Sequence, residues 1–136
     1  MSKISPKRIA ASPSSGLPDQ VSRAVEAAAS KKAEDIVVLD LKEAAGFTDY
    51  FVIGTGGNPR QIKAIADAVE ETLAAGQAKP AHVEGYGRSE WILLDYFDFI
   101  VHVFSAETRT FYGLERLWGS ATSVDLRALL HPPARR

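Results

Sequence analysis

The chain of 136 residues contains no cysteine. Disulfides, thiolate nucleophiles and cysteine-ligated zinc sites are therefore excluded, and the fold must be stabilised by its core alone. The three histidines, His82, His102 and His131, are too scattered to match a recognisable metal-ligand spacing. His102 alternates with apolar neighbours, which is more typical of a buried sheet histidine than of a catalytic base. We expect neither a metal nor a cofactor.

Long apolar runs are also missing, since no stretch reaches the length of about 18 residues that a membrane-spanning helix needs. The beginning of the chain has no apolar segment of the kind found in secretory signals. We therefore expect no membrane association and a cytoplasmic location.

Positive charge is scarce in the central part of the chain. Residues 21–124 carry ten basic and fifteen acidic side chains, a balance of about −5, whereas both ends of the chain are basic. Proteins that grip nucleic-acid backbones do so largely through lysine and arginine. The composition therefore disfavours direct, sequence-specific nucleic-acid binding and favours a basic protein partner.

The length and a hydrophobic content of 46% predict a single folded domain. The two ends are rich in proline, serine or charge, a composition that cannot bury enough apolar surface to offset the entropy of ordering. We expect a flexible N-terminal tail over residues 1–17, a domain over residues 18–120 and a C-terminal tail over residues 121–136.

Hydrophobic periodicity predicts three helices and five strands in the order α-β-β-α-β-β-β-α. The helices are expected over residues 18–32, 59–75 and 107–118, and the strands over residues 35–42, 48–55, from 83, 90–96 and 98–105. In the last helix, Phe111, Leu114 and Trp118 are expected to face inward. This order indicates a mixed α/β fold, with a five-stranded mixed sheet flanked by helices.

The segment 89–104 combines aromatic and acidic side chains with residues typical of strand interiors. Its aromatic candidates are Trp91, Tyr96 and Phe97, and its acidic candidates are Asp95 and Asp98. Aromatic side chains dominate binding hot spots, and acids around them select a basic partner. The pattern indicates a docking surface, although Trp91 suits a core position equally well. Ile92, Leu94, Val101 and Val103 are expected in the core.

A second candidate is the turn Thr55-Gly56-Gly57-Asn58, which precedes the helix beginning at Pro59. Free amides at a helix N-terminus attract anions, and such a turn in a mixed sheet is also found in nucleotidyltransferases. These enzymes need carboxylates that converge on two metal ions. Asp95 and Asp98 are three residues apart, so a regular strand would point them to opposite faces. An enzyme using Gly56 and Gly57 remains the alternative hypothesis.

Several spaced motifs together resemble one known family. They are FTDYFVIGTGGNPRQ (residues 47–61), AIAD (64–67), EG (84–85), WILLDYFDFIVHVF (91–104) and FYGLERLW (111–118). In combination they are similar to the Iojap family of ribosomal silencing factors (RsfS), over residues 21–118. The resemblance implies a nucleotidyltransferase-like α/β fold that lacks the catalytic carboxylates, and therefore a binding protein rather than an enzyme.

The resemblance also implies a partner and a mechanism. Family members bind the large ribosomal subunit through its ribosomal protein fourteen, on the face where the small subunit docks. Subunit joining is then blocked sterically, and translation is repressed under nutrient limitation. An exposed aromatic patch is equally compatible with a homodimer, which we keep as a further possibility.

The residues implied by the resemblance lie mainly in the segment 91–98. The family motif at the contact matches Trp91, Ile92, Asp95 and Tyr96, so that Trp91 and Tyr96 would be apolar anchors and Asp95 and Asp98 would face basic groups. Phe97 stands where the family usually has glycine, which alters the turn or adds contact surface. Asp49, Tyr50 and Glu84 would support this surface.

Overall fold

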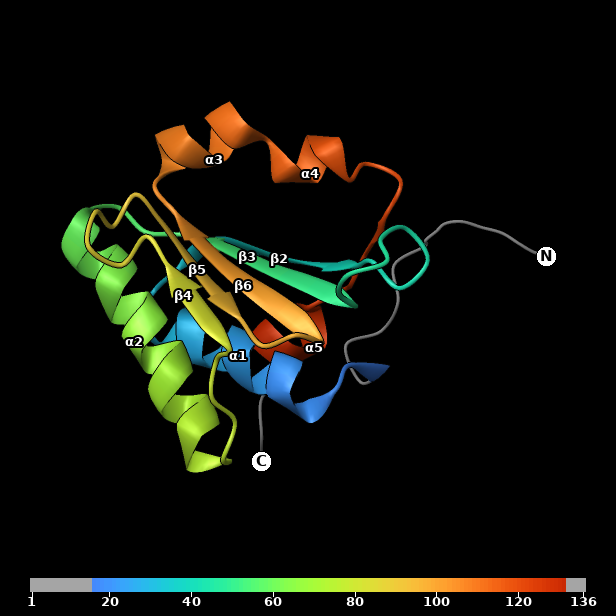
Figure 1. Cartoon of the computed structure of the whole chain (residues 1–136), viewed down its shortest axis with the longest axis horizontal. Helices are drawn as coiled ribbons and strands as arrows, with labels where there is room; N and C mark the ends of the chain where they lie inside the picture. The colour runs from blue at the N-terminus through green and yellow to red at the C-terminus, as the bar shows by residue number, and fades with distance from the viewer. Residues whose placement is uncertain (1–15, 132–136) are drawn as a thin grey trace.

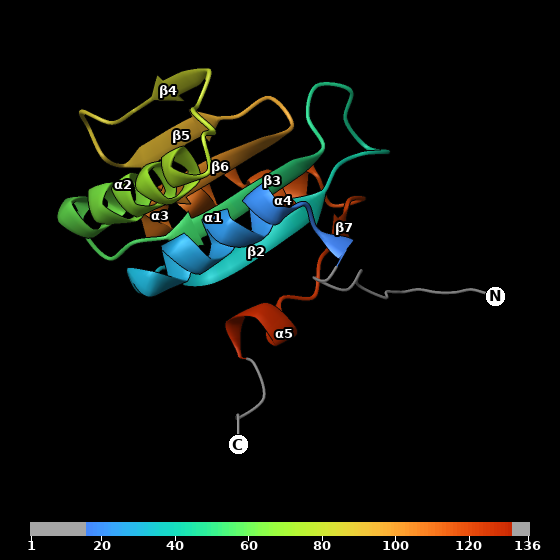
Figure 2. The ribbon, with the colours of Figure 1, turned by 90° about the horizontal axis from the view of Figure 1, so that it is seen from below.

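The structure is a computed structural model that describes residues 16–131, and it confirms the mixed α/β fold. The strands form one sheet of six, in the order β4-β5-β6-β3-β2-β7 (Figures 1 and 2). Their bounds are β2 Glu34–Asp40, β3 Tyr50–Thr55, β4 His82–Glu84, β5 Trp91–Asp95, β6 Phe99–Phe104 and β7 Thr122–Ser123. The sheet therefore contains the five expected strands and one more, β7.

The centre of the sheet is the parallel pair β3 and β6, in which Tyr50 lies opposite Phe99 and Thr55 opposite Phe104. Every residue of these two strands is buried. A parallel pair cannot be closed by a hairpin, so the chain crosses between the two strands through α2, β4 and β5. The other neighbouring strands pair antiparallel.

Helices cover both faces of the sheet. Their bounds are α1 Asp19–Ser30, α2 Pro59–Ala75, α3 Ala106–Tyr112, α4 Leu114–Leu117 and α5 Arg127–Leu130. Figures 1 and 2 show α1, α2 and α5 on one face and α3 with α4 arching over the other. The larger core lies under α1 and α2, where Val21, Val25 and Leu73 are almost fully buried.

Helix α2 begins and ends where the sequence predicts. The side chain of Asn58 accepts a hydrogen bond from the Gln61 amide at 2.8 Å, and Pro59 occupies the first helical position. Gly76 follows the last turn. With 17 residues, α2 is shorter than a membrane span, and no helix within residues 16–131 is long and apolar enough to cross a membrane.

The single last helix expected over residues 107–118 is wrong, because Gly113 divides it into α3 and α4. Gly113 adopts a left-handed conformation with φ +56°, which ends α3 and redirects the chain. The inward orientation expected for Phe111 is therefore also wrong, since its side chain is 76% exposed. Leu114 and Trp118 do pack, partly buried, on the sheet.

A partly buried arginine, Arg109, fixes the redirected chain to the sheet. Arg109 pairs with Glu115 through two contacts of 2.9 and 3.0 Å across the α3–α4 junction, and it also donates to Thr55 Oγ1 at 2.8 Å. The guanidinium lowers the pKa of the Glu115 carboxyl. This network holds α3 and α4 over the end of β3.

The structure also corrects the expected domain end at residue 120. Strand β7 pairs with β2, Val124 and Leu126 are buried, and α5 lies against α1. The folded domain therefore continues at least to Leu130. Residues 132–136, and residues 1–15 of the expected N-terminal tail, lie outside the described residues.

Gly85, which follows β4, provides a stability test of the β4–β5 connection. It has φ +82°, and a Cβ at this position would lie 1.9 Å from the Trp91 carbonyl oxygen. We predict that Gly85→Ala lowers the free energy of unfolding by at least about 1 kcal/mol in urea titrations. Gly87→Ala is the matched control, because nothing lies within 4 Å of its Cβ position. Equal stability of the two variants would contradict this packing.

Candidate partner-binding site

The candidate residues at positions 95–98 form the tight turn between β5 and β6. Asp95 Oδ1 accepts a hydrogen bond from the Phe97 amide at 2.8 Å, and the Tyr96 amide donates to the Phe99 carbonyl at 2.9 Å. Phe97 adopts the left-handed conformation, with φ +71°. A bulky residue in this region is strained, so the carboxylate of Asp95 has a structural task in holding the turn.

The end of this turn is exposed and acidic. The Phe97 side chain is 70% exposed, and both Asp98 and Asp49 are exposed beside it. The Asp49 amide donates to the Asp98 carbonyl at 2.9 Å, and Thr48 Oγ1 donates to the Phe97 carbonyl at 2.8 Å. The fold therefore brings together Asp49, Phe97 and Asp98, which we call the turn tip.

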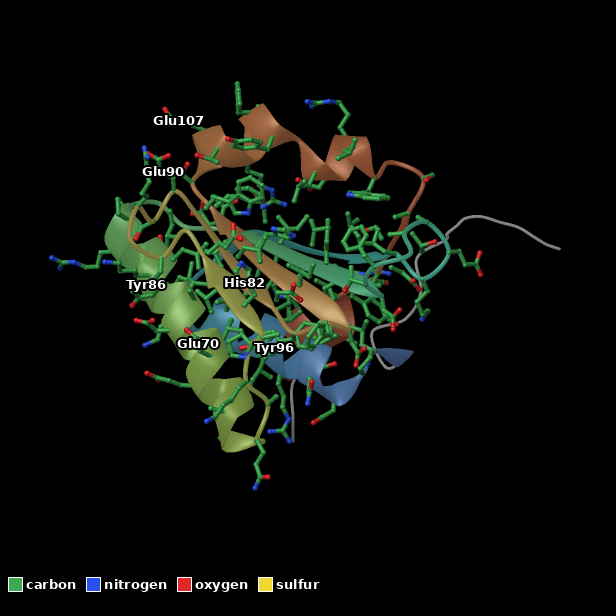
Figure 3. The ribbon with its side chains drawn as sticks, viewed as in Figure 1. Glu70, His82, Tyr86, Glu90, Tyr96 and Glu107 are labelled. Carbon is green, nitrogen blue, oxygen red and sulfur yellow. The ribbon has the colours of Figure 1, made fainter. Side chains whose placement is uncertain are left out.

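Tyr96 and Tyr50 point into the core on the face of the sheet that α1 and α2 cover. Tyr96 is 8% exposed and stacks on Phe99, with ring centroids 4.9 Å apart, close to Glu70 of α2 (Figure 3). Burial is the larger cause, and Glu70 the smaller, of a rise in the Tyr96 pKa to about 12. Tyr50 is buried and accepts a hydrogen bond from Lys42 at 2.8 Å. Because neighbouring strand residues face opposite sides, Tyr96 cannot be an exposed anchor on the side of Asp95.

Strand β5 presents Trp91, Leu93 and Asp95 on the side facing away from α1 and α2. These three half-buried residues, which we call the β5 face, alternate with Ile92 and Leu94, whose side chains are fully buried. The sequence prediction of Ile92 and Leu94 as core residues is confirmed. Leu93 was not identified from the sequence, although its position midway between Trp91 and Asp95 in the two-residue alternation could have revealed it.

Aromatic packing holds Trp91 in place. Its ring lies 4.9 Å from the ring of Phe104 and 4.6 Å from that of Tyr112, measured between centroids. Its indole nitrogen donates to His102 Nδ1 at 3.0 Å. Trp91 is therefore partly core and partly surface, which combines the two interpretations that the sequence allowed.

Glu84 lies on the edge strand β4, opposite Leu93, so it flanks the β5 face. Its carboxylate contacts the imidazole of His82, and both side chains are exposed. A carboxylate and an imidazole at this edge leave the rim of the surface polar.

The turn at Gly56 and Gly57 uses its amides internally. The Gly56 amide donates to the Phe104 carbonyl at 2.9 Å, and the Gly57 amide donates to Gln61 Oε1 at 2.6 Å. A Cβ on residue 56 would lie 2.7 Å from Ile62 Cγ1, so close packing against α2 explains this glycine. Within residues 16–131, no group of three or more histidine, aspartate or glutamate side chains could hold a metal ion.

Known proteins resemble this chain in both sequence and fold. The family model described as ribosomal silencing factor during starvation (RsfS) matches residues 14–136. Ribosomal silencing factor RsfS of Halalkalibacterium halodurans is 36% identical over 107 residues, covering 79% of this chain and 92% of the relative. RsfS of Bacillus subtilis is 38% identical over 96 residues, covering 71% and 81%.

More distant relatives extend the comparison. The mouse protein named mitochondrial assembly of ribosomal large subunit protein 1 is 31% identical over 91 residues, covering 65% of this chain and 40% of the mouse protein. A crystal structure of a Chromobacterium violaceum protein superposes with a TM-score of 0.73 at 33% identity, covering 74% of this chain and 84% of that one. Because the family model spans nearly the whole sequence, the chain belongs to the ribosomal silencing factor (RsfS) family.

Proposed function

We propose that this protein represses translation by binding the large ribosomal subunit through its ribosomal protein fourteen and blocking the approach of the small subunit. Family membership supports the silencing role, and the family description links it to starvation. The name of the mouse relative supports an association with the large subunit. Steric exclusion needs only occupancy of a surface, so the mechanism requires no chemical step.

The half-exposed β5 face is the observation that carries this proposal. Trp91 and Leu93 expose apolar surface on a rigid strand, and Asp95 lies at its end. Rigid aromatic side chains such as that of Trp91 bind with little loss of conformational entropy, and hot spots are rich in them. The turn tip extends the surface with Phe97 and Asp98.

The charges of this surface suit a basic protein partner. Asp49 and Asp98 are exposed at the turn tip, and Glu84 flanks the β5 face. Residues 21–124 carry an acidic balance of about −5, which repels phosphate backbones. We therefore propose contact with a ribosomal protein, with Tyr50 and Tyr96 supporting the surface from within the sheet.

Binding, rather than catalysis, is the activity that we propose. The glycine turn has its Gly56 and Gly57 amides engaged within the protein, so it offers neither of them to a phosphate group. Asp95 holds the turn at Phe97 instead of converging with Asp98 on a metal site. Titration with nucleotides and Mg²⁺ is expected to give no heat of binding.

Phe97→Asn separates binding from stability. Asparagine tolerates the left-handed conformation, so the free energy of unfolding should stay equal or rise slightly. Loss of the exposed ring should weaken binding by about tenfold, the equivalent of about 1.4 kcal/mol. Co-sedimentation with purified large subunits and urea unfolding measure the two effects. Phe97→Tyr is the control and should bind like the wild type, whereas unchanged binding by the asparagine variant would remove Phe97 from the interface.

Asp98→Lys tests the charge of the turn tip. Reversing an exposed acid opposite basic groups should slow association and lower affinity several-fold at low salt, and the deficit should shrink as salt screens it. Glu26→Lys makes the same change of charge on the exposed side of α1, and it should bind like the wild type. Association rates measured across ionic strengths distinguish a local charge effect at the turn tip from an effect of net charge. Equal losses in both variants would indicate an effect of net charge alone.

The order of addition tests the steric mechanism. The protein should inhibit translation when it is added to separated subunits and should act far less on preformed, translating ribosomes. It should not hydrolyse or transfer nucleotides in either case. Equal inhibition of both preparations would contradict steric exclusion, and nucleotide turnover that is lost in Asp95→Asn would restore the enzyme hypothesis.

A further inference from the structure

His102 of β6 is a buried polar side chain directly beside the β5 face. The residue is 3% exposed and lies opposite Leu93 in the β5–β6 ladder. Its imidazole meets the ring of Phe51 edge-on, with centroids 4.4 Å apart, and lies parallel to the ring of Phe104 at 5.9 Å. An apolar cage of this kind disfavours a charged group.

The contact with Trp91 determines the protonation state of this imidazole. The indole Nε1 can only donate, so His102 Nδ1, 3.0 Å away, must be the acceptor and carries no proton. Burial lowers the pKa of His102 to about 3, so the ring is neutral at physiological pH. The single proton therefore lies on Nε2.

That second nitrogen has no hydrogen-bond partner within residues 16–131. A buried N–H without a partner destabilises a fold, because its hydrogen bond to water is lost and not replaced. A phenylalanine or leucine at position 102 would fill the same cage without this cost. Among residues 16–131, the hydrogen bond to Trp91 is the only one that the imidazole makes.

We propose that His102 is a positioning residue for partner recognition, which holds the Trp91 indole in the orientation that forms the β5 face. The inference rests on the proposed function. Without the acceptor, the indole N–H would have no partner beside Tyr112, and the ring would turn its nitrogen toward water. A pre-oriented ring binds more tightly because less conformational freedom is lost on association.

His102→Phe tests this role in a double-mutant cycle with Trp91→Phe, which keeps an aromatic ring but has no N–H. We expect His102→Phe alone to weaken large-subunit binding about five- to tenfold, the loss expected for one hydrogen bond, without lowering the free energy of unfolding. In the Trp91→Phe background it should cause no further loss. A merely structural role would change unfolding instead of binding.

Two further measurements make the test specific. His102→Asn places an acceptor near the position of Nδ1, so it should recover part of the affinity even though it packs less well. The chain has two tryptophans, and the indole N–H resonance of Trp91 is the one missing from Trp91→Phe spectra. This resonance should shift in free His102→Phe protein, because its acceptor is lost.

The outcomes separate this inference from the proposed function. If the wild type binds large subunits and His102→Phe binds equally well, or if the two substitutions give additive losses, the positioning role is wrong and the proposed function stands. If the wild type does not bind large subunits, the proposed function fails and the recognition role of His102 fails with it. Loss of binding in His102→Phe with equal loss of unfolding free energy would also overturn the inference.

Discussion

Two parallel strands that are buried on both faces, β3 and β6, determine the plan of this molecule. A strand pair of this kind needs cover on each side and a crossover outside the sheet plane. Helices α1 and α2 supply the cover on one face, and α3 with α4 supply part of it on the other (Figures 1 and 2). Because the second cover is incomplete, β5 retains a half-exposed face.

Several energetically unfavourable features occur at that strand, its turn and the neighbouring β6. Phe97 occupies a left-handed conformation, and the buried Nε2 of His102 has no partner in the described part of the chain. Trp91 remains half-exposed although aromatic rings pack around it. Local costs of this kind persist where function requires a particular geometry, and their position agrees with a binding role for the β5 face. At the glycine turn that follows β3, in contrast, close packing against α2 accounts for the presence of Gly56.

Local signals carried much of the sequence prediction. Asn58 and Pro59 mark the start of α2 and Gly76 its end, because caps act over a few neighbouring residues. The two-residue alternation of β5 predicts that Ile92 and Leu94 are buried, as the structure confirms. The short elements at the C-terminus escaped prediction, since β7 has two residues and α5 four, and neither is long enough to show a period. They are stabilised by contacts with β2 and α1, which are distant in the sequence.

The sequence by itself determined the fold class, the family and the segment that carries the candidate site, because these depend on motifs and on local periodicity. Only the tertiary structure decided how that segment is used. The helix ends at the left-handed Gly113, and Phe111 is exposed instead of facing inward. Tyr96 is buried in the core instead of lying on the surface. The hydrogen bond between Trp91 and His102 joins residues eleven positions apart on paired strands. The register of a sheet creates such contacts, and register follows from the packing of the whole molecule.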